Sequence, residues 1–216
     1  MRHAILAALV VVSLVSSVTF AGYTEVSDVG ALPGSAADLT GTGDTQIFGT
    51  AGNSDVDMFK IYITAPTAFS ASAAGSDFDT QLQLFDALGY GVYANDDDTV
   101  IFEPSLLPAG HALSPTSAGT YFLAVSYWSD DPLSTGGEIF AGSFNDVMEP
   151  TGPGGSSPIS GWDGGGTGSG NYTITLTGVG VAPDGPPAVP VPGSALLCCA
   201  GLALMRSVRR RRTAQA

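Results

Sequence analysis

Between Gly22 and Pro187 the sequence contains no cysteine and no arginine, and Lys60 is its only lysine. Both cysteines of the chain, Cys198 and Cys199, lie near the C-terminus. The absence of cysteine excludes disulfides and thiol chemistry from this span. The near absence of Lys and Arg excludes nucleic acid as a partner, because a protein binds a phosphate backbone through clustered positive charge.

Catalytic motifs and helical periods are also missing from this span. His111 is its only histidine, and neither a Gly-x-Ser-x-Gly elbow nor a His-Glu-x-x-His pair occurs. We therefore expect a protein that is not an enzyme. A hydrolase that uses loop carboxylates stays open as an alternative, since carboxylates are too abundant here to single out an acid and a base.

Acidic residues dominate the same span. All 20 Asp and Glu residues fall within it, so that its formal charge is 1 minus 20, or −19. Such a charge makes cations the natural partners. A span of this length can bury about two thirds of its unfolded surface, and one domain is expected.

Short runs of alternating apolar and polar residues predict strands. The strand predicted at 120–128 has apolar residues on both faces, Phe122, Ala124 and Trp128 on one of them, so we expect both faces to be covered. Many short strands separated by turn signals predict an all-β sandwich or barrel. The predicted strands are 57–64, 67–73, 78–86, 92–94, 120–128 and 171–177, with one more at 139–144 inside an insertion at 129–170.

The N-terminus has the pattern of a signal peptide. Arg2 and His3 precede an apolar stretch, which closes at Thr19-Phe20-Ala21 with small residues at the positions that signal peptidase prefers. We predict a signal peptide at 1–21 and an exported protein.

The C-terminus resembles the PEP-CTERM sorting signal of bacteria that make extracellular polysaccharide. A Pro-rich linker at 179–192 ends in the motif Val189, Pro190, Val191 and Pro192, in which Val191 stands where that family has glutamate. A hydrophobic segment and an arginine cluster follow at 193–212, and the stop consists of Arg209, Arg210, Arg211 and Arg212. The resemblance implies an exosortase-like processing enzyme as a partner and delivery to the cell surface or the extracellular matrix. A lasting C-terminal membrane helix with positive-inside flank is the alternative.

Five segments in order resemble the bacterial pre-peptidase C-terminal domain: 54–61, 78–86, 94–98, 115–125 and 170–176. The resemblance covers 45–178, after a lead-in at 22–44, and implies a jelly-roll-like β-sandwich. Some members of that family bind calcium or matrix polymers. The insertion at 129–170 is longer than the family pattern, and no protease domain accompanies the chain.

Aspartates supply the candidate metal ligands. Asn53, Asp55 and Asp57 alternate as in the opening of calcium loops, but Met58 stands where an EF-hand has glycine. A different calcium site could form if a sandwich brings these loops to one end. The predicted ligands are Asp55, Asp57, Asp77, Asp79, Asp96, Asp97 and Asp98; the alternative is that these residues only cap turns.

We therefore expect a non-enzymatic structural or adhesive protein of the cell surface or of a polysaccharide (biofilm) matrix, with calcium as a stabilising ion. A carbohydrate-binding module that recognises a specific glycan is the alternative function. It would use Tyr127, Trp128 and Trp162, whose rings could stack on sugars, unless Trp128 packs on the covered face of its strand.

Overall fold

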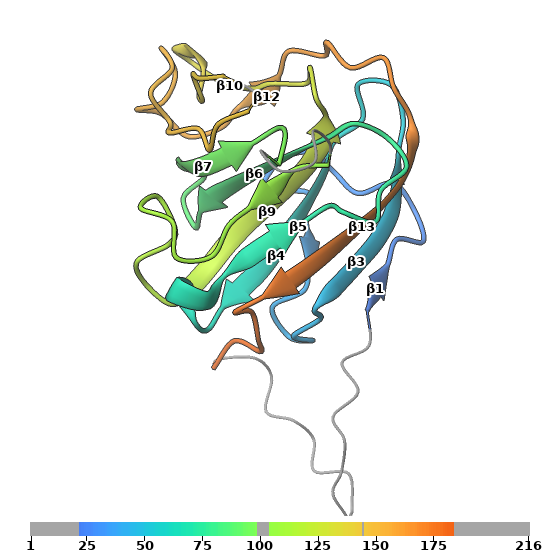
Figure 1. The fold of residues 1–216 in the computed structure, drawn as a ribbon, viewed down its shortest axis with the longest axis vertical. Helices are drawn as coiled ribbons and strands as arrows, with labels where there is room; N and C mark the ends of the chain where they lie inside the picture. Colours follow the sequence, from blue (N-terminus) through green and yellow to red (C-terminus); the bar gives the residue numbers. More distant parts are fainter. Residues whose placement is uncertain (1–21, 99–103, 144, 184–216) are drawn as a thin grey trace, which may run out of the picture. The chain divides into compact units, whose positions relative to one another are not determined.

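In the computed structural model the described residues are 22–98, 104–143 and 145–183 (Figure 1). Their regular elements are strands, apart from one 3₁₀ turn, η1 (Pro66–Ala68). The predicted all-β class is confirmed. Within these ranges no helix has the length and hydropathy needed to cross a bilayer. The predicted signal peptide, sorting motif and arginine stop lie outside the described residues.

The first sheet has five strands. Its central strand β13 is antiparallel to β3 on one side and to β5 on the other, whereas the short edge strand β1 runs parallel to β3. In order across the sheet the strands are β1 (Tyr23–Thr24), β3 (Gln46–Ala51), β13 (Gly170–Thr177), β5 (Ser70–Ser72) and β8 (Leu106–Leu107).

The second sheet also has five strands, and its longest strand, β9, lies at the centre. The edge strand β2 pairs parallel with β4, and all other pairs are antiparallel. The order is β2 (Ala37–Asp38), β4 (Asp57–Ile63), β9 (Gly119–Tyr127), β6 (Thr80–Asp86) and β7 (Gly91–Asn95).

The main core lies between these two sheets. The predicted inward residues Phe59, Leu82, Leu84 and Ile174 are fully buried there. In these strands, alternation with a period of two therefore predicted both the strand and the face that points into the core. One predicted strand differs: 67–73 begins with η1, because Pro66 occupies the first position of a 3₁₀ turn, and only β5 remains extended.

The insertion after β9 forms a third layer on the outer face of the second sheet. Its small sheet consists of β11 (Gly137–Glu138), β10 (Pro132–Ser134) and β12 (Gly161–Trp162), which Figure 1 shows next to β6 and β7. Ile139 and Phe140 pack on Phe85 in a second apolar cluster. Both faces of β9 are therefore covered, as predicted, but Ile139 and Phe140 lie outside any strand.

Buried glutamines help to fasten this third layer. The Gln83 Nε2 donates to the Gln81 Oε1 at 2.8 Å and to the Ser126 hydroxyl at 3.0 Å. The Gln81 Nε2 in turn donates to the Asp131 carboxylate at 3.2 Å. These bonds join β6 and β9 to the start of the insertion. The polar side chains on this face of β6 are therefore buried with their hydrogen bonds made inside the protein.

The connections that carry the predicted metal ligands lie at one end of the two large sheets. In the registers of the second sheet the first residues of β4 and β6 lie opposite the last residues of β9, and the last residue of β7 lies opposite β6 near its start. At the other end Val179 bridges to Ile63, the last residue of β4, and Gly22 lies beside Gln46, the first residue of β3. The described domain therefore begins and ends away from its acidic loops.

Candidate metal centre

Asp57 is the first residue of β4, and its side chain is completely buried. One carboxylate oxygen, Oδ2, accepts a hydrogen bond of 2.7 Å from the hydroxyl of Tyr172 on β13. The other oxygen, Oδ1, has no hydrogen-bond donor among the described residues. A buried carboxylate with an unsatisfied oxygen is costly unless a proton or a cation neutralises it.

Two further carboxylates meet Asp57 from the segment that follows β1. Oxygen atoms of Glu25, Asp28 and Asp57 all lie within 4.8 Å of one another. The backbone N–H of Thr50 donates to the Glu25 carboxylate at 3.0 Å and thereby fixes it beside β3. Three carboxylates at this spacing suit a hard divalent cation, whose oxygen ligands lie at about 2.3 to 2.6 Å from the ion.

Gly49 makes room for this arrangement. A Cβ atom at position 49 would collide with the Tyr172 hydroxyl and with the Glu25 carboxylate. Any larger residue there would displace both the donor to Asp57 and one member of the carboxylate group. The glycine on β3 is therefore part of the site, although it contributes no ligand.

The pKa values of the site are shifted because negative charges lie close together where water is excluded. Burial is the main cause that raises the pKa of Asp57 to about 7. The hydrogen bond from Tyr172 is the next largest effect and opposes this rise, and the charges of Glu25, Asp55 and Asp28 add to it. Burial, together with the nearby Asp57, also raises the pKa of Tyr172. Near neutral pH the Asp57 carboxyl is therefore divided between its protonated and ionised forms.

A pocket of about 430 Å³ lies beside the group. Glu25, Asp28 and Tyr172 line it, together with Ser27, Thr50 and Asn171. The pocket therefore gives access to the carboxylates of Glu25 and Asp28, whereas Asp57 is buried behind its lining residues. The hydroxyl and amide oxygens that line the pocket are also of the type that calcium accepts as ligands.

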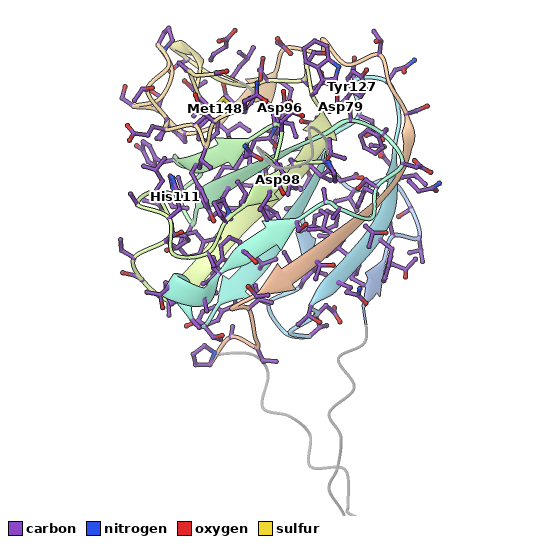
Figure 2. All side chains as sticks on the ribbon, in the orientation of Figure 1. Asp79, Asp96, Asp98, His111, Tyr127 and Met148 are labelled. Carbon is purple, nitrogen blue, oxygen red and sulfur yellow. The ribbon has the colours of Figure 1, made fainter. Side chains whose placement is uncertain are left out.

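A second acidic group joins two loops that were predicted from the sequence to lie at the same end of the sandwich. Carboxylate oxygens of Asp79, Asp96 and Asp97 lie within 4.8 Å of one another, and Figure 2 shows Asp79 and Asp96 at the same end of the domain. The buried Asn95 braces the loop, because its Nδ2 donates to the carbonyl of Asp97 at 2.8 Å and its Oδ1 accepts from the Leu106 N–H at 2.8 Å.

The seven predicted ligands thus share one end of the domain but not one site. Asp57 belongs to the first group, and Asp79, Asp96 and Asp97 form the second. Asp55 and Asp98 are in neither group, although the charge of Asp28 helps burial to raise the pKa of Asp55. Asp77 has a structural role, because its two oxygens accept from the N–H and the Nδ2 of Asn171 at 2.6 and 2.7 Å.

Glu25 and Asp28 were missed by the sequence analysis. They lie in the lead-in, to which no strand was assigned, and they reach Asp57 only because the two-residue strand β1 pairs parallel with β3. The available signal was their position: they are the first two acidic residues after the predicted cleavage site.

The candidate sugar-stacking aromatics separate into two kinds. Trp162 packs against the second apolar cluster, and its indole N–H donates to the carbonyl of Ala31 at 2.9 Å. Trp128 instead is 45 % exposed, so the expectation that it lies on the covered face is wrong. The reason is that Trp128 follows the last residue of β9, beyond the part of the strand that the insertion covers.

His111 is exposed, and its Nδ1 accepts a hydrogen bond of 3.2 Å from the backbone N–H of Leu113. This contact belongs to the local turn. Comparison of the chain with protein-family models and with curated proteins finds no match in either set.

Proposed function

We propose that the chain is an exported, non-enzymatic structural or adhesive protein of the cell surface or extracellular matrix, stabilised by calcium. The observation that carries the calcium part is the buried Asp57 carboxylate, with an unsatisfied oxygen, in contact range of Glu25 and Asp28. A cation there would join the segment after β1, the edge strand of the first sheet, to the start of β4 in the second sheet. In a secreted domain without cysteine, this would take the place of a disulfide.

Thermal unfolding with calcium and with chelator tests this proposal. At a calcium concentration of about 100 times the dissociation constant, binding stabilises a folded protein by about 2.7 kcal/mol, which raises the midpoint of a domain of this size by roughly 5 to 10 °C. We expect a shift of this order for residues 22–183, which contain both apolar clusters. An equal midpoint in millimolar calcium and in EDTA would remove calcium from the proposal.

The route to the surface rests on the two ends of the sequence. We propose a PEP-CTERM-type tail, cut by an exosortase-like enzyme, on a jelly-roll-like domain related to the pre-peptidase C-terminal family. The acidic loops would then face away from the point of attachment, since residues 178–182 leave from the other end of the sheets.

Intact-mass analysis of the protein recovered from its native cell surface tests the proposed processing. We expect a polypeptide that begins at Gly22 and ends near Pro192, because the signal peptide and the tail would both have been removed. A mass that still includes Arg209 to Arg212 would favour a lasting membrane anchor.

Carbohydrate binding is a second candidate function, and the exposure of Trp128 favours it. An indole ring at the surface offers an apolar face on which a sugar ring can stack. Trp162 suits this function less well, because its partly buried ring packs against the second apolar cluster and its N–H is already bonded.

A further inference from the structure

Residues 22–28 lie at the edge of the first sheet and are attached to it by a short strand. Within them β1 pairs with β3 over two residues (Figure 1). The backbone N–H of Glu25 continues this pairing, since it donates to the carbonyl of Phe48 at 2.9 Å. Tyr23 packs on the main core, with its ring 5.8 Å from that of the buried Phe59. A segment held by so short a strand can open locally at a small cost in free energy.

The end of this segment is exposed to solvent. Val26 is 94 % exposed, and Ser27 and Asp28 are exposed beside it. The next residue, Val29, is buried in the main core and fixes the chain from there on. Residues 22–28 can therefore move as a unit, while the residues that follow stay in place.

Two of the three carboxylates that meet at Asp57 belong to this segment, those of Glu25 and Asp28. The buried Asp57 oxygen without a hydrogen-bond donor is the observation that indicates a cation between them. Without a cation the three carboxylates repel one another, and the two on the segment are free to move away, whereas Asp57 is held on β4 by the hydroxyl of Tyr172. With a cation the same carboxylates become ligands that hold the segment in place.

We infer that a cation bound by Glu25, Asp28 and Asp57 holds residues 22–28 on the edge of β3, and that its removal releases this segment while both large sheets stay folded. This inference rests on the proposed calcium site and specifies what the ion controls. The released edge presents the carbonyl of Phe48 and the N–H of Thr50, which the segment otherwise occupies. Unpaired groups of this kind on an edge strand can pair with another chain, so calcium would control whether the edge of β3 is open.

Hydrogen exchange of the full chain in detergent, in calcium and in EDTA, tests the inference. The reporters are the amides of Glu25 and Thr50, whose hydrogen bonds break when the segment leaves. The reference is the amide of Leu176 on β13, which donates to the carbonyl of Thr45. In EDTA we expect the reporters to be at least about tenfold less protected than Leu176, because they open locally. Calcium at about 100 times its dissociation constant should slow their exchange by up to about 100-fold, because each opening must first release the ion.

Glu25→Gln retains an oxygen for the N–H of Thr50 but removes a charged ligand, so it should lose most of the slowing by calcium. Glu149→Gln is the matched control, since it makes the same change at an exposed residue outside both acidic groups, and it should behave as the wild type does. The inference is overturned, and the calcium site stands, if calcium raises the thermal midpoint but the reporters are as well protected as Leu176 in EDTA or do not respond to calcium. If calcium changes neither the midpoint nor the exchange, the proposed calcium site fails together with the inference.

Discussion

Replacement of Asp57 by asparagine is expected to abolish stabilisation by calcium and, at pH 8 in EDTA, to make the protein more stable than the wild type. The two effects have one cause. A pKa raised from 3.8 to about 7 corresponds to a cost on the order of 4 kcal/mol for keeping this carboxyl ionised in the folded protein. Calcium would offset that cost in the wild type, whereas asparagine removes both the cost and the ligand.

The gain in stability of Asp57→Asn in EDTA depends on which interactions asparagine retains. Its amide oxygen can still accept the hydrogen bond of Tyr172, so the buried hydroxyl of Tyr172 stays satisfied. A buried amide with one bond still costs free energy, and we therefore expect Asp57→Asn to gain roughly 2 kcal/mol in EDTA rather than the full amount. Urea unfolding at pH 8, with and without calcium, measures both quantities.

Asp146→Asn serves as the control, because Asp146 is exposed and belongs to neither acidic group. It removes the same formal charge, so it should change stability little and leave the calcium response intact. If calcium stabilises Asp57→Asn as strongly as the wild type, the ion binds elsewhere, and Asp79, Asp96 and Asp97 become the place to search. A loss of stability of Asp57→Asn in EDTA would contradict the assigned cost of the buried charge.

The sequence was sufficient for the parts of the fold that depend on local alternation. In β4 and β6 apolar residues recur at every second position, and the two faces follow directly from this period. The second face of β6 was not foreseen as buried. Its glutamines Gln81 and Gln83 are polar, and only the covering insertion makes them interior residues.

The candidate site was less predictable, since it depends on contacts between distant segments. Asp57 could be identified from its spacing to Asp55, but Glu25 reaches it through a strand of two residues that carries no period. The two tryptophans show the same limit. Trp162 is held by the distant carbonyl of Ala31, and Trp128 is exposed because the covering layer ends before it.

The metal-free protein is expected to become more stable as the pH falls from 8 to 5. The pKa of Asp57 is raised in the folded state, so folding favours the protonated carboxyl. Its contribution is complete below the ordinary pKa of 3.8 and is lost as the pH rises through about 7. Burial raises the pKa values of Asp55, Asp130 and Asp131 in the same direction.

Asp38 does not change this trend. Its pKa is lowered from 3.8, chiefly by the hydrogen bond from Thr40 and also by Lys60, so its contribution is constant between pH 8 and 5 and is lost only on further acidification. Because the ion pair of Asp38 with Lys60 is exposed, that later loss should also be small. The net slope between pH 8 and 5 should therefore follow the buried carboxyls.

Calcium should change the slope, because protons and the cation compete for the same carboxylate. Urea unfolding in EDTA should give a free energy of unfolding that increases by a few kcal/mol from pH 8 to 5. In calcium the increase should be much smaller, and the stabilisation by calcium should fade below about pH 6 as Asp57 takes up its proton. Asp57→Asn should lose most of the slope in EDTA, which separates the effect of this residue from the general relief of negative charge. A wild type whose stability falls from pH 8 to 5 in EDTA, or a calcium effect that is equal at both ends of this range, would mean that Asp57 is not the group through which protons and calcium act.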